Sequence, residues 1–231
     1  PVYPWGIRYY ADVDLLSPDG GGSFWEGAPI GVSWDVCGSE APYVRILMSY
    51  DGGNSGVWYY LTNYISNTGY ATVSAPLVTS TNSHVRFRVI AYANMSGTIA
   101  ASDGSWDNNT IMDDTIAPSN PTACAETHGA QNGVWQNTVS NPAFTWSGAY
   151  DGESGLKGYF WYFGTSSAAE PSTWTTTAGC DPAGVSSGTY YLRVKTEDVA
   201  GNRSSAVTLF TLKYDKTAPT NPTSCAETHG A

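Results

Sequence analysis

One segment of this chain occurs twice, and the repetition indicates how the chain is divided. TIAPSNPTACAETHGA, residues 115–130, returns as KTAPTNPTSCAETHGA, residues 216–231, with four differences and an offset of 101 residues. A period near 100 residues with a proline-rich opening is typical of strings of β-sandwich domains, each beginning with the same linker and first strand. We therefore expect a complete repeat over 115–215, a different domain over 17–114, and the first strand of a further repeat over 216–231.

The hydrophobic pattern predicts strands throughout. In HVRFRVIAYA, residues 84–93, Val85 and Phe87 alternate with Arg86 and Arg88, which places the apolar side chains on one face of a strand. No apolar stripe has helical spacing. We expect an all-β fold made of two consecutive antiparallel β-sandwiches, with Trp34 and Trp146 in their cores. Residues 1–16 are predicted to be an aromatic N-terminal arm or extra strand.

The charge balance excludes some partners. The formal net charge is −10, and such a surface repels phosphate, so we expect neither nucleic acid nor an anionic membrane as a partner. The sequence contains no run of 18 apolar residues and does not begin like a signal peptide, so we expect no membrane insertion and a mature or trimmed product.

Three motifs in residues 115–215 carry a family resemblance. APSNP, DGESGLKGY and DVAGN resemble the opening segment and turns of bacterial immunoglobulin-like and fibronectin-type-III-like domains of large secreted surface proteins. The first domain, with SPDGG, MSYDGG and VRFRV, is more distantly similar to another secreted immunoglobulin-like type. The resemblance implies two immunoglobulin-like sandwiches at the cell surface, acting as spacers, stalks, adhesive units or accessory domains of secreted enzymes. It implies little about activity.

The cysteines suggest an oxidising compartment. A bridge between Cys124 and Cys180 would close a loop of 56 residues and contribute roughly 4 kcal/mol. Cys225 repeats Cys124, so its partner would lie in the next repeat. Cys37 is either a free thiol or paired with Cys225 of another chain.

Asp and Asn side chains in turns supply the oxygen ligands that calcium needs, and they form two candidate groups. A cation at the first group would stiffen the junction between the domains, as in cadherin-like arrays, and the second group lies in the two family turns. The alternative is that these residues only hydrogen-bond the local backbone. The first group is Asp103, Asp107, Asn108, Asp113 and Asp114, and the second is Asp151, Glu153, Asp198 and Asn202.

No constellation in the sequence predicts catalysis. GVSSG, residues 184–188, matches a serine-hydrolase pattern but falls between two predicted strands, where no nucleophile elbow forms. Cys124, Glu126 and His128 could supply half of a zinc site, although a disulfide would consume the thiol. We expect no enzyme and no required cofactor.

Tryptophans are the remaining functional signal. Those in or beside loops could stack on sugars, or pack at sandwich ends and subunit contacts. They are Trp5, Trp25, Trp58, Trp106, Trp135 and Trp174.

These observations favour a non-enzymatic, extracellular structural or adhesive surface protein, assembled with copies of itself or with neighbouring surface proteins into a stalk, sheath or filament. The terminal segments could exchange strands between subunits. The alternative is an accessory carbohydrate-binding or spacer module of a secreted hydrolase, with glycans as partners.

Overall fold

The computed structural model describes residues 12–37 and 40–226, with the backbone alone at Val36 and Cys37. The described residues form strands, turns and loops and no helix, so the protein is all-β as predicted. None of them therefore lies in a helix that could cross a membrane. The chain divides into two compact units. The first contains the chain up to residue 117 together with two later turns, 151–155 and 198–202, and the second contains the remainder.

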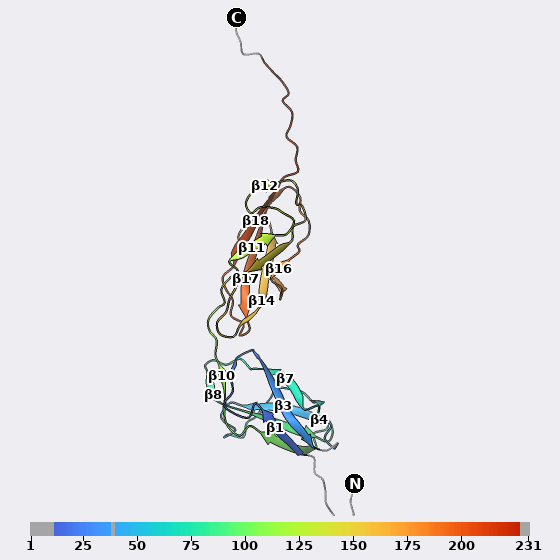
Figure 1. Ribbon diagram of the computed structural model, residues 1–231, viewed down its shortest axis with the longest axis vertical. Helices are drawn as coiled ribbons and strands as arrows, with labels where there is room; N and C mark the ends of the chain where they lie inside the picture. Colours follow the sequence, from blue (N-terminus) through green and yellow to red (C-terminus); the bar gives the residue numbers. More distant parts are fainter. Residues whose placement is uncertain (1–11, 38–39, 227–231) are drawn as a thin grey trace, which may run out of the picture. The chain divides into compact units, whose positions relative to one another are not determined.

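The first unit is a sandwich of two sheets (Figure 1). Its strands are β1 (Asp12–Ser17), β2 (Ser23–Trp25), β3 (Pro29–Cys37), β4 (Tyr43–Ser49), β5 (Tyr59–Tyr60), β6 (Ile65–Ser66), β7 (Tyr70–Ser74), β8 (Asn82–Tyr92), β9 (Ile99–Gly104) and β10 (Asn109–Met112). One sheet has the order β1-β3-β7. The other has the order β2-β10-β8-β4-β5, with β6 on β4 and β9 on β8. The pairs are antiparallel except β2 with β10, which is parallel.

Alternation along β8 builds this core. Val85, Phe87 and Val89 are fully buried against the other sheet, whereas Arg86 and Arg88 lie on the opposite face, which confirms the predicted pattern. Trp34 on β3 is 2% exposed, and its indole N–H donates a hydrogen bond to Asn67 Oδ1 at 2.7 Å. The ring therefore fills the core with its polar atom satisfied.

The second unit is also a sandwich of two sheets. Its strands are β11 (Ala123–Glu126), β12 (Trp135–Gln136), β13 (Phe144–Ser147), β14 (Leu156–Gly164), β15 (Thr173–Thr175), β16 (Gly179–Cys180), β17 (Gly188–Asp198) and β18 (Val207–Tyr214). The orders are β11-β13-β16 and β12-β18-β17-β14-β15. Trp146 is 4% exposed and packs edge-on against Tyr159, with ring centroids 5.5 Å apart. Its predicted core position is confirmed.

The first two strands of both sandwiches pair in the same way. In each unit an early strand pairs antiparallel in the three-stranded sheet, and the next short strand crosses to the other sheet and pairs parallel with the last strand, as β2 does with β10 and β12 with β18. Two different sequences therefore give the same arrangement of first strands.

The predicted terminal segments are only partly described. Residues 1–11 of the predicted arm, which include Trp5, lie outside the described residues, and from Asp12 the chain is strand β1 of the first sandwich. At the other end, residues 216–226 are exposed and contain no strand, although their first copy forms β11. In the first copy β11 pairs with β13, and no corresponding strand accompanies the second copy within the described residues. Residues 227–231 lie outside them.

Candidate metal centre

Three aspartates from distant parts of the sequence come together in the first unit. Asp114 follows β10, Asp151 lies in the DGESG turn, and Asp198 ends β17. Each offers one carboxylate oxygen, and these three oxygens all lie within 4.8 Å of one another. The two turns that carry Asp151 and Asp198 belong to the same compact unit as Asp114.

The turn at 151–155 forms because its aspartate binds the local backbone. Asp151 Oδ2 accepts hydrogen bonds from the backbone N–H of Glu153 at 3.1 Å and of Gly155 at 2.6 Å. Gly155 has a φ of +88°, a conformation in which glycine is favoured. One oxygen of Asp151 is therefore used by the turn itself.

The turn at 198–202 is built in the same way. Asp198 Oδ1 accepts hydrogen bonds from the backbone N–H of Gly201 at 2.7 Å and of Asn202 at 2.8 Å, and Gly201 has a φ of +102°. The two turns also bind each other, since Val199 N–H donates to Gly155 O at 2.9 Å.

Asp114 is held by both turns. Its Oδ2 accepts a hydrogen bond from Ser154 N–H at 3.0 Å, and its backbone carbonyl accepts one from the Asn202 side-chain amide at 2.8 Å. Its own N–H donates to Oε1 of the buried Glu26 at 3.2 Å. The position of Asp114 is therefore fixed by contacts that span 88 residues of sequence on either side.

One carboxylate oxygen in the cluster has no partner. Asp198 is fully buried, and its Oδ2 makes no hydrogen bond among the described residues. A buried, unpaired carboxylate oxygen is costly because the group has lost its hydration. A proton or a cation would satisfy it.

Burial and mutual repulsion shift the pKa values of the acids in the cluster. Burial raises the pKa of Asp198, and the nearby Asp114 carboxylate raises it further, although the N–H groups of the turn oppose both effects. Burial also acts to raise the pKa of Asp114, but hydrogen bonds from Ser154 and Ile116 outweigh it and the net direction is downward. Desolvation and the carboxylates of Asp114 and Asp151 raise the pKa of Glu153. Repulsion between two ionised carboxylates at this spacing is on the order of 3 kcal/mol at an effective dielectric constant of about 20.

The cluster combines the two groups predicted from sequence. Asp114 comes from the first group and meets Asp151 and Asp198 of the second, with Glu153 and Asn202 beside them. Of the other members of the first group, Asp113 adds its charge beside the cluster and helps to raise the pKa of Glu153, whereas the remaining three are used elsewhere. Asp103 accepts a hydrogen bond from Leu15 N–H, Asp107 from Asn108 N–H, and Asn108 from Arg86, while the Asp113 N–H donates to Thr81.

Glu26 was not anticipated from the sequence. Its Oε2 accepts a hydrogen bond from Val78 N–H at 2.7 Å while Oε1 holds Asp114, so a buried carboxylate at 5% exposure joins the start of the sandwich to its end. The available signal was a single acid between the apolar Trp25 and the turn at residues 27–29. An acid that is buried in such a place needs backbone N–H groups as hydrogen-bond donors.

The zinc half-site considered at CAETHGA does not form. The buried Glu126 carboxylate accepts hydrogen bonds from three backbone N–H groups, those of His128, Ala130 and Ala143, at 2.8–3.0 Å. His128 Nδ1 lies 2.8 Å from Asn141 O. The oxygens that a metal would need are used to shape the loop, which is a structural role for the repeated motif.

The predicted Cys124–Cys180 disulfide is absent, and both residues have free thiols. Cys124 pairs with Trp146 on one side of β13, and Cys180 pairs with Phe144 on the other side. Two strands separated by a third are roughly 9.5 Å apart, beyond the reach of a disulfide. Burial raises the pKa of Cys124 to about 11 and, together with nearby Cys124 and Asp181, that of Cys180 to about 12. Cys225 is exposed, and the side chain of Cys37 lies outside the description.

The predicted loop tryptophans differ in exposure. Trp106 is 82% exposed, Trp135 is 57% exposed and Trp174 is 39% exposed. Trp25 and Trp58 are half-buried. The indole of Trp174 packs on Phe160 with centroids 4.9 Å apart, whereas Trp106 makes no ring contact with another described aromatic residue.

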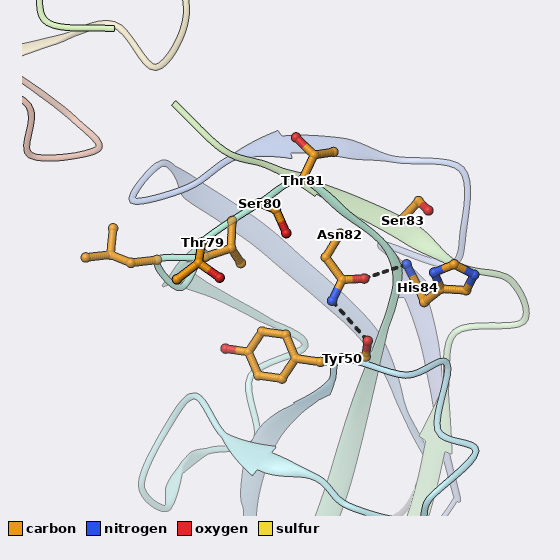
Figure 2. A pocket seen from close by; sticks show the side chains of 9 residues that line it. Tyr50, Thr79, Ser80, Thr81, Asn82, Ser83 and His84 are labelled. Atoms are coloured by element: carbon orange, nitrogen blue, oxygen red, sulfur yellow. Dashed lines mark hydrogen bonds between the residues drawn. The ribbon is translucent and has the colours of Figure 1, made fainter. Parts of the chain in front are cut away.

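A surface pocket of about 470 Å³ lies elsewhere in the first unit (Figure 2). It is lined by Tyr50 and by residues 77–84, with Asn82 joining Tyr50 O and His84 N–H by hydrogen bonds of 3.0 and 2.8 Å. Its lining includes one histidine and no carboxylate or thiol. The pocket therefore contains no acid–base pair.

No family model and no curated protein matches the sequence. Among solved structures, the chain is similar to fibronectin(III)-like modules of CbhA from Clostridium thermocellum, with 15% identity and a TM-score of 0.29 over 87% of this chain and 93% of that one. A chimeric titin Z1Z2 matches with 17% identity and a TM-score of 0.37, over 88% and 98% of the two chains. Latent PorU from Porphyromonas gingivalis matches with 13% identity and a TM-score of 0.30, over 93% of this chain and 25% of that one.

Proposed function

We propose that this chain is a non-enzymatic, extracellular structural or adhesive module, and that its first unit binds a calcium ion through Asp114, Asp151 and Asp198. The observation that carries the proposal is the buried Asp198 oxygen without a partner, in a cluster of three carboxylates. Calcium takes carboxylate and carbonyl oxygens in flexible geometry, which suits ligands supplied by two turns and a strand end.

The ion would act on stability. It would neutralise the repulsion within the cluster and fix both turns to the end of β10, where Glu26 already holds the Asp114 backbone. A ligand that binds only the folded state stabilises it by about 2.7 kcal/mol when its free concentration is 100 times Kd. Millimolar calcium outside cells would keep such a site filled. The proposed surface role is supported by the family motifs and by the acidic composition of this all-β chain.

Melting of the intact chain in calcium and in a chelator tests this. We expect calcium to raise the temperature at which the first unit unfolds. Hydrogen exchange in peptides of β8, followed as the temperature rises, reports that unfolding. Asp198→Asn should abolish the calcium response while leaving the calcium-free protein as stable or more stable, because it removes a buried charge. Glu40→Gln, which changes an exposed acid of the same unit, should retain the full response. An equal response in wild type and Asp198→Asn would reject the site.

A second candidate function is supported by Trp106. An indole that is 82% exposed can stack on a sugar ring, which would suit an accessory module of a secreted hydrolase. Retention of the chain on an insoluble polysaccharide, lost in Trp106→Ala, would favour this function over the purely structural one. Retention that is unchanged in Trp106→Ala would argue against this residue.

A further inference from the structure

The outer face of the three-stranded sheet in the first unit is acidic. Along β1, Val13 and Leu15 point into the core, and Asp12 and Asp14 are exposed. Asp35 on β3 is exposed and directly opposes Asp14 in the antiparallel register. Like charges at opposed positions repel because their β-carbons are about 5 Å apart. None of these three acids belongs to an ion pair found among the described residues.

The outer face of the other sheet carries arginine and aromatic side chains. The register pairs Arg45 with Ile90 and Leu47 with Arg88, so both arginines lie on the same face. The Arg45 guanidinium lies over the ring of Tyr60, 3.4 Å from its centroid, and Arg88 lies 5.2 Å from the centroid of Trp58.

These arginines also lack acidic partners. Among the described residues no carboxylate pairs with Arg45 or Arg88, and Arg86 beside them hydrogen-bonds the neutral Asn108. Tyr59 and Tyr60 are more than half exposed, and a small apolar cluster of Leu47, Ile90 and Tyr92 lies beneath. Arginine and tyrosine over an apolar base are enriched at protein interfaces.

We propose that the arginine-aromatic face of one chain docks on the acidic face of a second copy. This rests on the proposed structural function and specifies its partner. The two faces lie on opposite sides of one sandwich, since they are the outer surfaces of its two sheets. An anionic glycan would satisfy the arginines and leave the opposed Asp14 and Asp35 unrelieved, whereas a second copy satisfies both.

Such a contact joins two different surfaces of the same molecule. Heterologous contacts of this kind do not close after two subunits, and unless a rotation closes a ring they continue into open rows. At about 0.1 M salt the repulsion between chains of net charge −10 is screened beyond about 10 Å, so the close charge pairs of the contact should hold the chains together. At about 1 M salt these charge pairs are screened as well, and the contact should weaken.

Sedimentation velocity of the intact chain tests the contact. Wild type should show concentration-dependent association. D14K/D35K and R45E/R88E should each associate at least about tenfold more weakly, and an equimolar mixture of the two variants should associate again because their remaining faces are complementary. If R45E/R88E folds poorly, R45Q/R88Q takes its place, because its side chains are uncharged, and it should also associate more weakly than wild type. Circular dichroism would confirm folding.

Opposite results would reject the contact. Wild type that remains monomeric at millimolar concentration, variants that associate like wild type, or a mixture that stays monomeric would each overturn it. Binding of a polyuronate by a monomeric wild type would identify a glycan as the occupant instead. Runs in calcium and in chelator separate the two proposals, because association can fail while the calcium response of Asp198 remains, and the reverse.

Discussion

Gly27→Ala should damage the carboxylate cluster without touching a ligand. Gly27 has a φ of +72°, and an added β-carbon would lie 2.3 Å from the Val199 carbonyl oxygen, where contacts under 3.0 Å essentially never occur. The turn that begins at Asp198 would have to move by at least about 0.7 Å. The positive φ alone costs roughly 1–2 kcal/mol, and overpacking adds roughly 1–3 kcal/mol. We therefore expect a loss of about 2–5 kcal/mol in the first unit.

Gly56→Ala is the matched control. Gly56 lies in the same unit with the same φ of +72°, and an added β-carbon there meets nothing within 4 Å. It should lose only the roughly 1–2 kcal/mol of the backbone conformation. The difference between the two variants therefore measures the contact with the Val199 carbonyl.

The assay is denaturant-dependent hydrogen exchange in β8 peptides, which reports the first unit, combined with calcium titration. Gly27→Ala should bind calcium at least about tenfold more weakly, equivalent to about 1.4 kcal/mol, and Gly56→Ala should bind it like wild type. Equal destabilisation by the two substitutions, with equal calcium affinity, would refute the packing of the 198–202 turn on Gly27.

Other predictions concern the second unit. Iodoacetamide at pH 8 should label Cys225 well before Cys124 and Cys180, whose pKa values burial raises to about 11 and about 12, as peptide mass spectrometry of native and unfolded chains would show. Glu126→Ala should destabilise this unit by about 3 kcal/mol in urea unfolding, because three backbone N–H groups lose their acceptor, and a loss under about 1 kcal/mol would contradict this. Burial acts to raise the pKa of Glu197, but ion pairs with Lys157 and Arg203 outweigh it and lower the pKa. Stability from this depressed pKa is complete above about pH 4.3 and is lost as pH falls through the folded-state value, and Glu197→Gln should flatten that acid limb of the stability curve.

The strands and turns could be predicted from the sequence because the alternation of buried and exposed residues depends only on close neighbours in the chain. Alternation around Phe87 identifies a buried strand from four neighbouring residues, and the DGESG and DVAGN turns follow from an aspartate with a glycine four or three residues after it. Strand pairing is not local. Cys124 and Cys180 appeared suited to a bridge, and the insertion of β13 between their strands could not be read from either segment.

The carboxylate cluster was predicted in part for the same reason. Its two turns were recognised as one candidate group, while Asp114 was assigned to neighbours close in sequence, Asp107 and Asp113 among them. Contacts across 40 residues to Ser154 and 88 residues to Asn202 decide where Asp114 lies. Position in the sequence therefore identified Asp114 as a candidate without showing that Asp151 and Asp198 lie beside it.

The sequence left two roles for the turn aspartates, either accepting hydrogen bonds from the local backbone or binding a metal ion. In the structure one carboxylate can do both, because it has two oxygens. Asp151 and Asp198 each place a single oxygen, Oδ2 and Oδ1 respectively, on the N–H groups of their own turn. The second oxygen of each is left over, and in Asp198 it is buried without a partner. A turn needs only one acceptor, so an aspartate chosen for the turn alone could face its other oxygen to water at little cost. Burying that oxygen beside two further carboxylates is costly without a counter-charge, and this cost is the reason for proposing a bound cation at the cluster.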